Sequence, residues 1–220
     1  MDFDREIESH FQTLVKKGQI DVQELFIKHF ENEIDLFSSH MASAHNAWKN
    51  WDTNSNVDER EGFCKLLYLS IISLQISSMQ QFITGHISSS GNTQRQAFES
   101  IATTYLCANN SLQVFDSMKQ DKYSTQKSFK HLKKHGESMG VLPEALAFLD
   151  EMYNFYSELS HFSFLSRSML LGPETRSMYI GGYFDNKAMD VYRHEIERKV
   201  GISSKLVNIL QGIQYVLSRN

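Results

Sequence analysis

Proline is scarce in this sequence, with two residues in 220, whereas average usage would give about eleven. Because proline interrupts the hydrogen bonding of helices and sheets, its scarcity permits long helices and disfavours loop-rich and all-β folds. Cysteine is rare as well: Cys64 and Cys107 are the only two, and each lies within an apolar helical pattern. We interpret them as core residues of a protein from a reducing compartment, without a disulfide framework.

The chain also lacks a long apolar run. Its longest, residues 66–79, has 14 residues and contains five serine or glutamine side chains, whereas a bilayer span needs about 20 mostly apolar residues. The first eight residues are acidic and lack the apolar region of a signal peptide. A net charge of −4 gives no overall attraction to nucleic acid or to an anionic membrane. We therefore expect a cytoplasmic protein that does not contact a membrane.

Apolar residues recur at helical spacing through most of the chain. They predict about seven helices, over residues 2–18, 21–50, 58–87, 93–108, 119–135, 143–161 and 186–217. Near residues 167–184 the helical spacing of apolar residues gives way to the strings MLL, GPETR and SMYIGGYF. Two apolar runs on either side of a glycine and a proline favour a small β-hairpin there. There is no repeat and no linker, so we expect a single all-α domain over residues 1–220, a helical bundle with this hairpin.

One predicted helix stands out because it is apolar on every side. Its segment, residues 63–87, reads FCKLLYLSIISLQISSMQQFITGHI, and a helix that is apolar all round lies in the middle of a bundle. Ser70, Ser73 and Ser77 recur in it at three- and four-residue steps and share one narrow face. We expect the closest internal helix contact at that face, and a break in the chain at residues 88–92.

Arg95 and Glu99 are candidate site residues. They stand four apart on a predicted helix within an otherwise apolar run, a spacing at which the two side chains can pair. One interpretation is an ordinary intrahelical ion pair. The other is that Arg95 binds a phosphate and Glu99 orients it.

A second cluster lies in the string YSELSHFS, which contains Tyr156, Glu158, Ser160 and His161. Glu158 and His161 have the Glu-x-x-His spacing of di-iron helical bundles, but that centre needs a second such motif and the chain has none. We therefore predict no metal site and no cofactor. His161 remains either a catalytic acid or base or a helix-terminal histidine with a backbone partner, and Tyr156 and Ser160 are candidate binding residues.

The only concentrated basic patch is the string KHLKKH, residues 130–135. Lys130, Lys133 and Lys134 are candidate binding residues there, because such a face can contact phosphates. His131 and His135 could reach one metal ion, but the neighbouring lysines would repel it. The alternative is a solvated helix face.

The string RQAFESIATTYL, residues 95–106, is followed about 50 residues later by YSELSH. This order resembles a pattern of bacterial all-helical proteins, in which an Arg-x-x-x-Glu helix precedes a Tyr-x-x-Leu-Ser segment that carries a histidine. Several such proteins are similar to the HEPN superfamily, helical domains that dimerise and include metal-independent ribonucleases of toxin and antiphage systems. The resemblance implies an active centre at a dimer groove, where arginine and histidine act on a ribose-phosphate linkage. The superfamily's Arg-x(4–6)-His hallmark occurs here only at Arg5 and His10.

Three hypotheses on function follow from these patterns, and the weakest is a helical metal protein that uses Glu158, His161 and either Glu33 or His40. The first is a non-catalytic helical protein that self-associates, as a homodimer, and presents a surface to a protein partner. Long amphipathic helices and the absence of nucleophile and phosphate-loop motifs motivate it. The alternative is a HEPN-like metal-independent ribonuclease or toxin of a bacterial defence system, with Arg95, Glu99 and His161 at its centre and RNA as its partner.

Overall fold

The computed structural model describes residues 20–51, 58–160 and 181–219, together with residues 8, 9, 11–13, 15 and 18. The described residues form eight α-helices, four short 3₁₀ helices and no strand, which confirms the all-α prediction. The α-helices are α2 (Ile20–Lys49), α3 (Glu59–Ile83), α4 (Ile87–Ala108), α5 (Val114–Lys119), α6 (Ser128–His135), α7 (Pro143–Ser160), α9 (Met189–Ser203) and α10 (Leu206–Ser218). The 3₁₀ helices are Asn110–Leu112, Thr125–Lys127, Glu137–Met139 and Asn186–Ala188.

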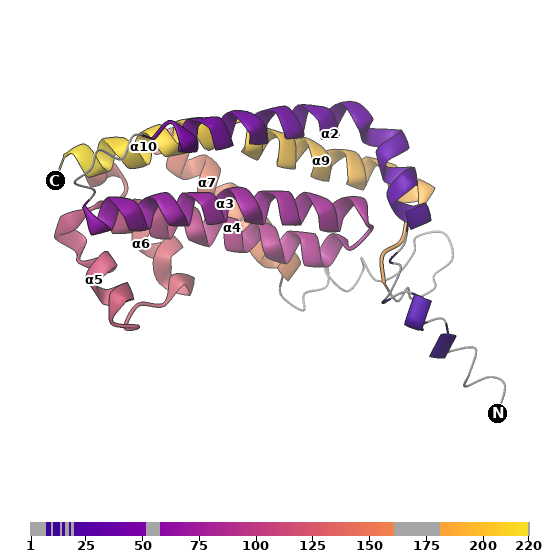
Figure 1. Ribbon diagram of the computed structural model, residues 1–220, viewed down its shortest axis with the longest axis horizontal. Helices are drawn as coiled ribbons and strands as arrows, with labels where there is room; N and C mark the ends of the chain where they lie inside the picture. Colours follow the sequence, from indigo (N-terminus) through magenta and orange to yellow (C-terminus); the bar gives the residue numbers. More distant parts are fainter. Residues whose placement is uncertain are drawn as a thin grey trace.

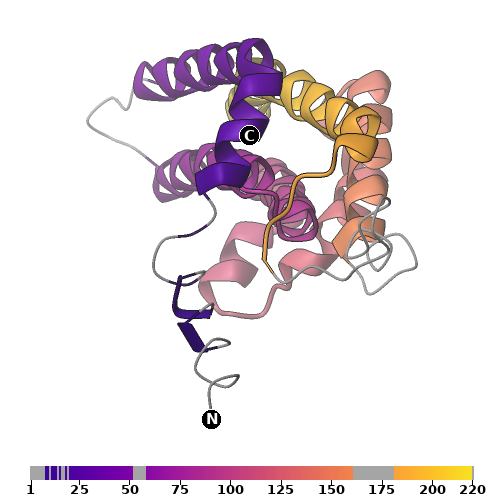
Figure 2. The same ribbon diagram turned by 90° about the vertical axis from the view of Figure 1, so that its right-hand side faces the viewer.

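The long helices lie side by side in two groups. Figure 1 shows α9 and α10 following one another along α2, while α3 and α4 run together beneath them. In Figure 2, turned by 90°, α3 lies toward one edge of the bundle and α7 toward the opposite edge. The two edges are therefore separated by α4, which packs against α3, α5, α6, α7 and α10.

The centre of the bundle is α4, and the prediction that residues 63–87 form it was wrong. Every residue from 101 to 108 on α4 is buried, whereas α3 buries only one side, including Tyr68 and Ile71. The predicted serine face lies on the opposite side of α3, where Ser70 and Ser73 are exposed and Ser77 is half-buried. Hydrophobicity on all sides of α3 therefore does not reflect burial on all sides.

The turn between α3 and α4 comes earlier than predicted. Gly85 has φ +78° and its N–H donates to the carbonyl of Phe82, while the N–H of His86 donates to that of Gln81. These two bonds form the motif that ends helices at a glycine. Residues 88–92, predicted as a break, are the first turns of α4, where buried Ser90 and Gly91 let neighbouring helices approach.

The last predicted helix is two helices. The break is at Ser204 and Lys205, whose N–H groups bond to the carbonyls of Val200 and Ile202, and Gly201 lies inside α9. Six of the seven predicted helices lie within the described residues; this division and the short helix α5, which was not predicted, bring the described α-helices to eight. Other boundaries agree: the Asp58 side chain accepts from the N–H of Arg60 at the start of α3.

Two predictions fall wholly or largely outside the described residues. Of the first helix, residues 2–18, only scattered positions are described. Of the hairpin at residues 167–184, only residues 181–184 are described, and these lie in no strand. The fold that positions the candidate sites is therefore the helical bundle of α2 to α10.

Candidate functional site

Arg95 and Glu99 pair on α4, as their spacing predicted. Arg95 Nε lies 3.4 Å from Glu99 Oε1, and the hydroxyl of Tyr153 on α7 donates to the same oxygen at 3.4 Å. The Tyr153 ring stacks on Phe129 of α6, with ring centroids 4.2 Å apart. Ser128 Oγ, next to Phe129, donates to the Glu99 carbonyl. Glu99 is thus buried where α4, α6 and α7 meet, and Arg95 beside it is half-buried.

The second predicted cluster, in the string YSELSHFS, is described only in part. Ser160 is the last residue of α7, and His161 lies outside the described residues. Glu158 is exposed on α7. No group of three His, Cys, Asp or Glu side chains that could hold a metal ion occurs in the part of the chain that the structure describes.

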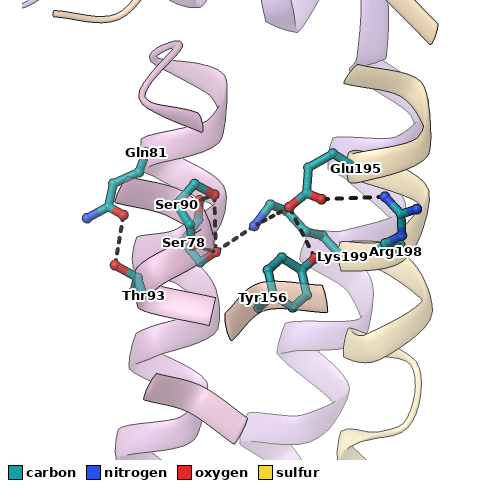
Figure 3. A network of polar contacts seen from close by, with 8 residues as sticks. All are labelled: Ser78, Gln81, Ser90, Thr93, Tyr156, Glu195, Arg198 and Lys199. Atoms are coloured by element: carbon teal, nitrogen blue, oxygen red, sulfur yellow. Dashed lines mark hydrogen bonds and ion pairs between the residues drawn. The ribbon is translucent and has the colours of Figure 1, made fainter. Parts of the chain in front are cut away.

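Tyr156 belongs to a polar network inside the bundle (Figure 3). Its hydroxyl donates to Glu195 Oε1 at 3.1 Å, and Lys199 Nζ lies 3.3 Å from the same carboxylate oxygen. Lys199 also donates to Ser78 Oγ at 2.5 Å, and Ser78 Oγ donates to the Ser90 carbonyl. Four helices, α3, α4, α7 and α9, thus meet in one chain of hydrogen bonds.

The network is closed to solvent. Tyr156, Ser78 and Ser90 are fully buried, and Lys199 and Glu195 are 1% and 4% exposed. Tyr156 therefore has a place in the interior and offers no surface to a ligand. Arg198 is the exception, since it lies over the Phe155 ring at the rim of the bundle and its Nη1 is 3.9 Å from Glu195 Oε2.

Burial sets the protonation of this network. It lowers the pKa of Lys199, an effect that the nearby Glu195 carboxylate opposes. Burial and then the charge of Glu195 raise the pKa of Tyr156 well above its ordinary value, so this phenol stays protonated and acts as a donor. With no access for a substrate, the arrangement joins helices rather than performing chemistry.

Two more buried polar residues lie close by along the same helix pair. Gln75 and Gln94 are at most 1% exposed, and within the described residues neither amide has a hydrogen-bond partner. The Ser78–Ser90 contact fixes an antiparallel register that brings Gln75 level with Gln94 across the α3–α4 interface. The interior between α3 and α4 is therefore more polar than a typical core.

The basic patch predicted on α6 is present. Lys130, Lys133 and Lys134 are exposed, and together with His131 and His135 they line a hollow of about 490 Å³. Lys133 pairs with Asp150 of α7 at 2.8 Å, and His131 bonds to the Tyr123 hydroxyl. The buried side of α6 consists of Ser128, Phe129 and Leu132.

The outward side of α3 consists of uncharged side chains, and we call it the α3 seam. Its residues follow one another at three- and four-residue steps: Leu66, Leu69, Ser73, Ile76 and Gln80. Leu66 is 65% exposed and Ile76 39%. No charged residue occurs from position 66 to position 85. Such spacing is typical of the contact line between two helices, yet no other helix of the described chain covers it.

Comparison of the chain with protein-family models, with curated proteins and with solved structures finds no match in any of the three. Function therefore has to be argued from the chemistry of the sites. Of these, the polar network is closed, the Arg95–Glu99 pair is partly accessible, and the α3 seam is open.

Sequence reasoning missed the network partners of Tyr156. Glu195 and Lys199 stand four apart on α9. Each directly precedes an apolar residue on the inner side of the helix: buried Ile196 follows Glu195, and half-buried Val200 follows Lys199. A glutamate and a lysine that recur at the same helical spacing as the buried apolar residues would have indicated a buried ion pair. The sequence did not distinguish Ser78, which is buried, from the neighbouring Ser73 and Ser77, which lie on the outward side of α3.

Proposed function

We propose that this protein is a non-catalytic, cytoplasmic helical protein that self-associates as a homodimer, and that the α3 seam is its protein-interaction surface. The observation that carries the proposal is the exposed position of Leu66 and Ile76 on a stretch of twenty uncharged residues. Exposed apolar side chains on an uncharged helix face can mark a protein-interaction site when a second surface completes the patch.

The seam is self-complementary. In a two-fold dimer with antiparallel α3 helices centred on Ser73, Leu69 lies within one residue of the level of Ile76 of the second copy, and Ile76 within one residue of the level of its Leu69. The two Ser73 side chains then meet on the axis, where small residues allow close approach of the backbones. No like charges oppose one another, because the seam carries none.

The expected strength of this dimer follows from its size. A helix of 25 residues is about 37 Å long, so a face about 10 Å wide buries on the order of 750 Å² in two copies. This area is below the roughly 1,200 Å² at which standard interfaces begin. We therefore expect a weak, reversible dimer with a dissociation constant on the order of micromolar.

By length and composition, α3 is the one described helix that could cross a membrane. Its inner side, however, is bonded into the bundle: the Tyr68 hydroxyl donates to the carbonyl of Leu206, and Ser78 donates to that of Ser90. A bilayer would have to replace these contacts. We therefore assign the seam to a protein partner of the same kind, a second copy.

The sharpest test is a cross-link at the proposed two-fold axis. Ser73→Cys places a thiol there, and under mild oxidation we expect a disulfide-linked dimer. Cys64 and Cys107 will not interfere, since both are buried and burial raises the pKa of both thiols. The matched control is Ser43→Cys, an exposed serine on α2.

Equal cross-linking of Ser73→Cys and Ser43→Cys, or none of either, would contradict the proposed axis. A second measurement is sedimentation as a function of concentration. Leu66→Glu should abolish the dimer by burying unpaired charge, whereas Leu36→Glu, at an exposed leucine of α2, should not. A parent protein that stays monomeric at about 1 mM, well above the expected dissociation constant, would end the proposal.

The alternative function is a HEPN-like metal-independent ribonuclease or toxin of a bacterial defence system, with RNA as substrate. The observation that favours it is the partly accessible Arg95 beside a Glu99 held by Tyr153. Arg95 would bind phosphate, Glu99 would position it, and His161 would act as acid or base. Cleavage of single-stranded RNA in the presence of EDTA, lost in both Arg95→Ala and His161→Ala, would support this function; absence of cleavage by the parent protein would end it.

A further inference from the structure

A cavity of about 600 Å³ opens between the start of α7 and one face of α10, with α4 at its floor. Its lining comes from Tyr105 of α4, from residues 140–142, from the first half of α7, and from α10 with Lys205 just before it. Both helices pack on α4, and the cavity keeps their facing sides apart.

The floor of the cavity is fixed by a close contact between α4 and α10. The Tyr105 hydroxyl lies where a Cβ on Gly212 would be, and it donates to the carbonyl of Ile209 at 3.2 Å. Any larger residue at position 212 would displace this ring. Burial raises the pKa of Tyr105 to about 12, so its hydroxyl stays protonated and satisfied.

One side wall is fixed in a similar way. Gly140 has φ +88°, a conformation that favours glycine, and a Cβ there would meet the ring of Tyr215 at 2.7 Å. Arg219, the residue after α10, lies over the same ring, 5.4 Å from its centroid. Tyr215 is therefore held in position although it is half exposed. The cavity is a built feature of the fold.

The lining chemistry defines the class of ligand. Three aromatic rings, Tyr105, Phe148 and Tyr215, and several aliphatic side chains supply most of the wall. Among the described residues, the only charged side chains that line it are Glu144 and Lys205, one of each sign, so a charged ligand gains at one and loses at the other. A neutral, largely apolar molecule fits this balance, and Asn208 and Gln211 offer it polar contacts.

The volume of the cavity fits a small molecule and is too small for a macromolecule. Ligand pockets range over about 300–1,000 Å³, and this cavity lies within that range. We infer that the space between α7 and α10 is a binding site for a neutral, largely apolar small molecule with an aromatic or alkyl body. None of its lining residues belongs to α3, so the inference is independent of the proposed dimer.

The test uses Nile red, a neutral polyaromatic dye, titrated into the purified full chain. We expect saturable binding of one dye per chain, with a blue-shifted emission. Ala145→Trp fills the cavity from α7 and should weaken binding by about tenfold or more. Ala147→Trp is the matched control, because Ala147 is an exposed alanine of the same helix that does not line the cavity. Circular dichroism of both variants checks that the fold is retained.

Three outcomes would overturn the inference. One is equal dye affinity in Ala145→Trp and Ala147→Trp, which would place the dye elsewhere. Another is loss of binding in Leu66→Glu, which would place it on the α3 seam. The third is dissociation of a dimer by Ala145→Trp in sedimentation, which would make a second copy the occupant of the cavity.

Discussion

Lys199 of α9 donates a hydrogen bond to the hydroxyl of Ser78 on α3 at 2.5 Å, and neither side chain reaches the solvent. Glu195, one turn earlier on α9, supplies the balancing charge at 3.3 Å. Because α9 follows α3 by more than a hundred residues, this contact joins distant parts of the chain. It requires one alignment of the two helices, since a shift by one turn would leave a buried ammonium without its partners.

Lys199→Met is therefore expected to lower the free energy of unfolding by about 3–5 kcal/mol, because Glu195 is left buried without its cation. The measurement is urea unfolding followed by circular dichroism. The double variant Lys199→Met/Glu195→Leu should recover most of the loss, since the buried pair is replaced by apolar groups. Lys205→Met, at an exposed lysine, should change stability by less than about 0.5 kcal/mol. A similar effect of both lysine substitutions would contradict this account.

Local signals in the sequence predicted much of the fold. Asp58 at the start of α3 and Pro143 at the start of α7 are helix-start residues whose effect depends only on their neighbours in the chain, and both boundaries agree. The spacing of Arg95 and Glu99 predicted their pairing for the same reason. Such features need no knowledge of the tertiary structure.

The predictions that were wrong depend on which face of a helix the rest of the chain covers. Apolar residues surround α3, so its sequence did not distinguish the buried side of Tyr68 from the exposed side of Leu66. The buried run of α4 contains Thr103 and Thr104, whose hydroxyls donate to carbonyls one turn earlier on the same helix. These threonines made the true central helix look more polar than α3.

The turn at Gly85 gives a second prediction. Gly85→Ala should lower the free energy of unfolding by about 2 kcal/mol or more, because φ is +78° and the new Cβ would lie 2.5 Å from the backbone nitrogen of Tyr183. Gly201→Ala should instead raise it by about 0.5–1 kcal/mol, since Gly201 is helical with open space at its Cβ position. Thermal or urea unfolding of the two variants measures both. Effects of the same sign would contradict the assigned backbone conformations.

Gln94 gives a third prediction. Its amide is fully buried with no hydrogen-bond partner among the described residues, and such a group costs about 1–3 kcal/mol relative to a satisfied one. Gln94→Met keeps the length of the side chain and removes this cost, so we expect stability to rise by about 1 kcal/mol. Gln80→Met, on the exposed seam, is the control and should be nearly neutral. A clear loss of stability in Gln94→Met would mean that an internal water bridges the amides of Gln94 and Gln75.

The buried thiols predict how stability changes at alkaline pH. Burial raises the pKa of Cys107 from 9.0 to about 12, so above pH 9.0 the unfolded state loses a proton that the folded state keeps. The contribution of this thiol is therefore fully present below pH 9.0 and is lost progressively as pH rises toward 12, at about 1.4 kcal/mol per pH unit. Urea unfolding of the parent protein and of Cys107→Ala, from about pH 8 to about pH 11, measures the difference. Lys199 and Tyr156, whose pKa shifts have no contribution from Cys107, are common to both proteins and cancel in it. The parent should lose stability more steeply by that amount per unit above pH 9, and parallel curves would show that Cys107 titrates normally and is not enclosed by the core.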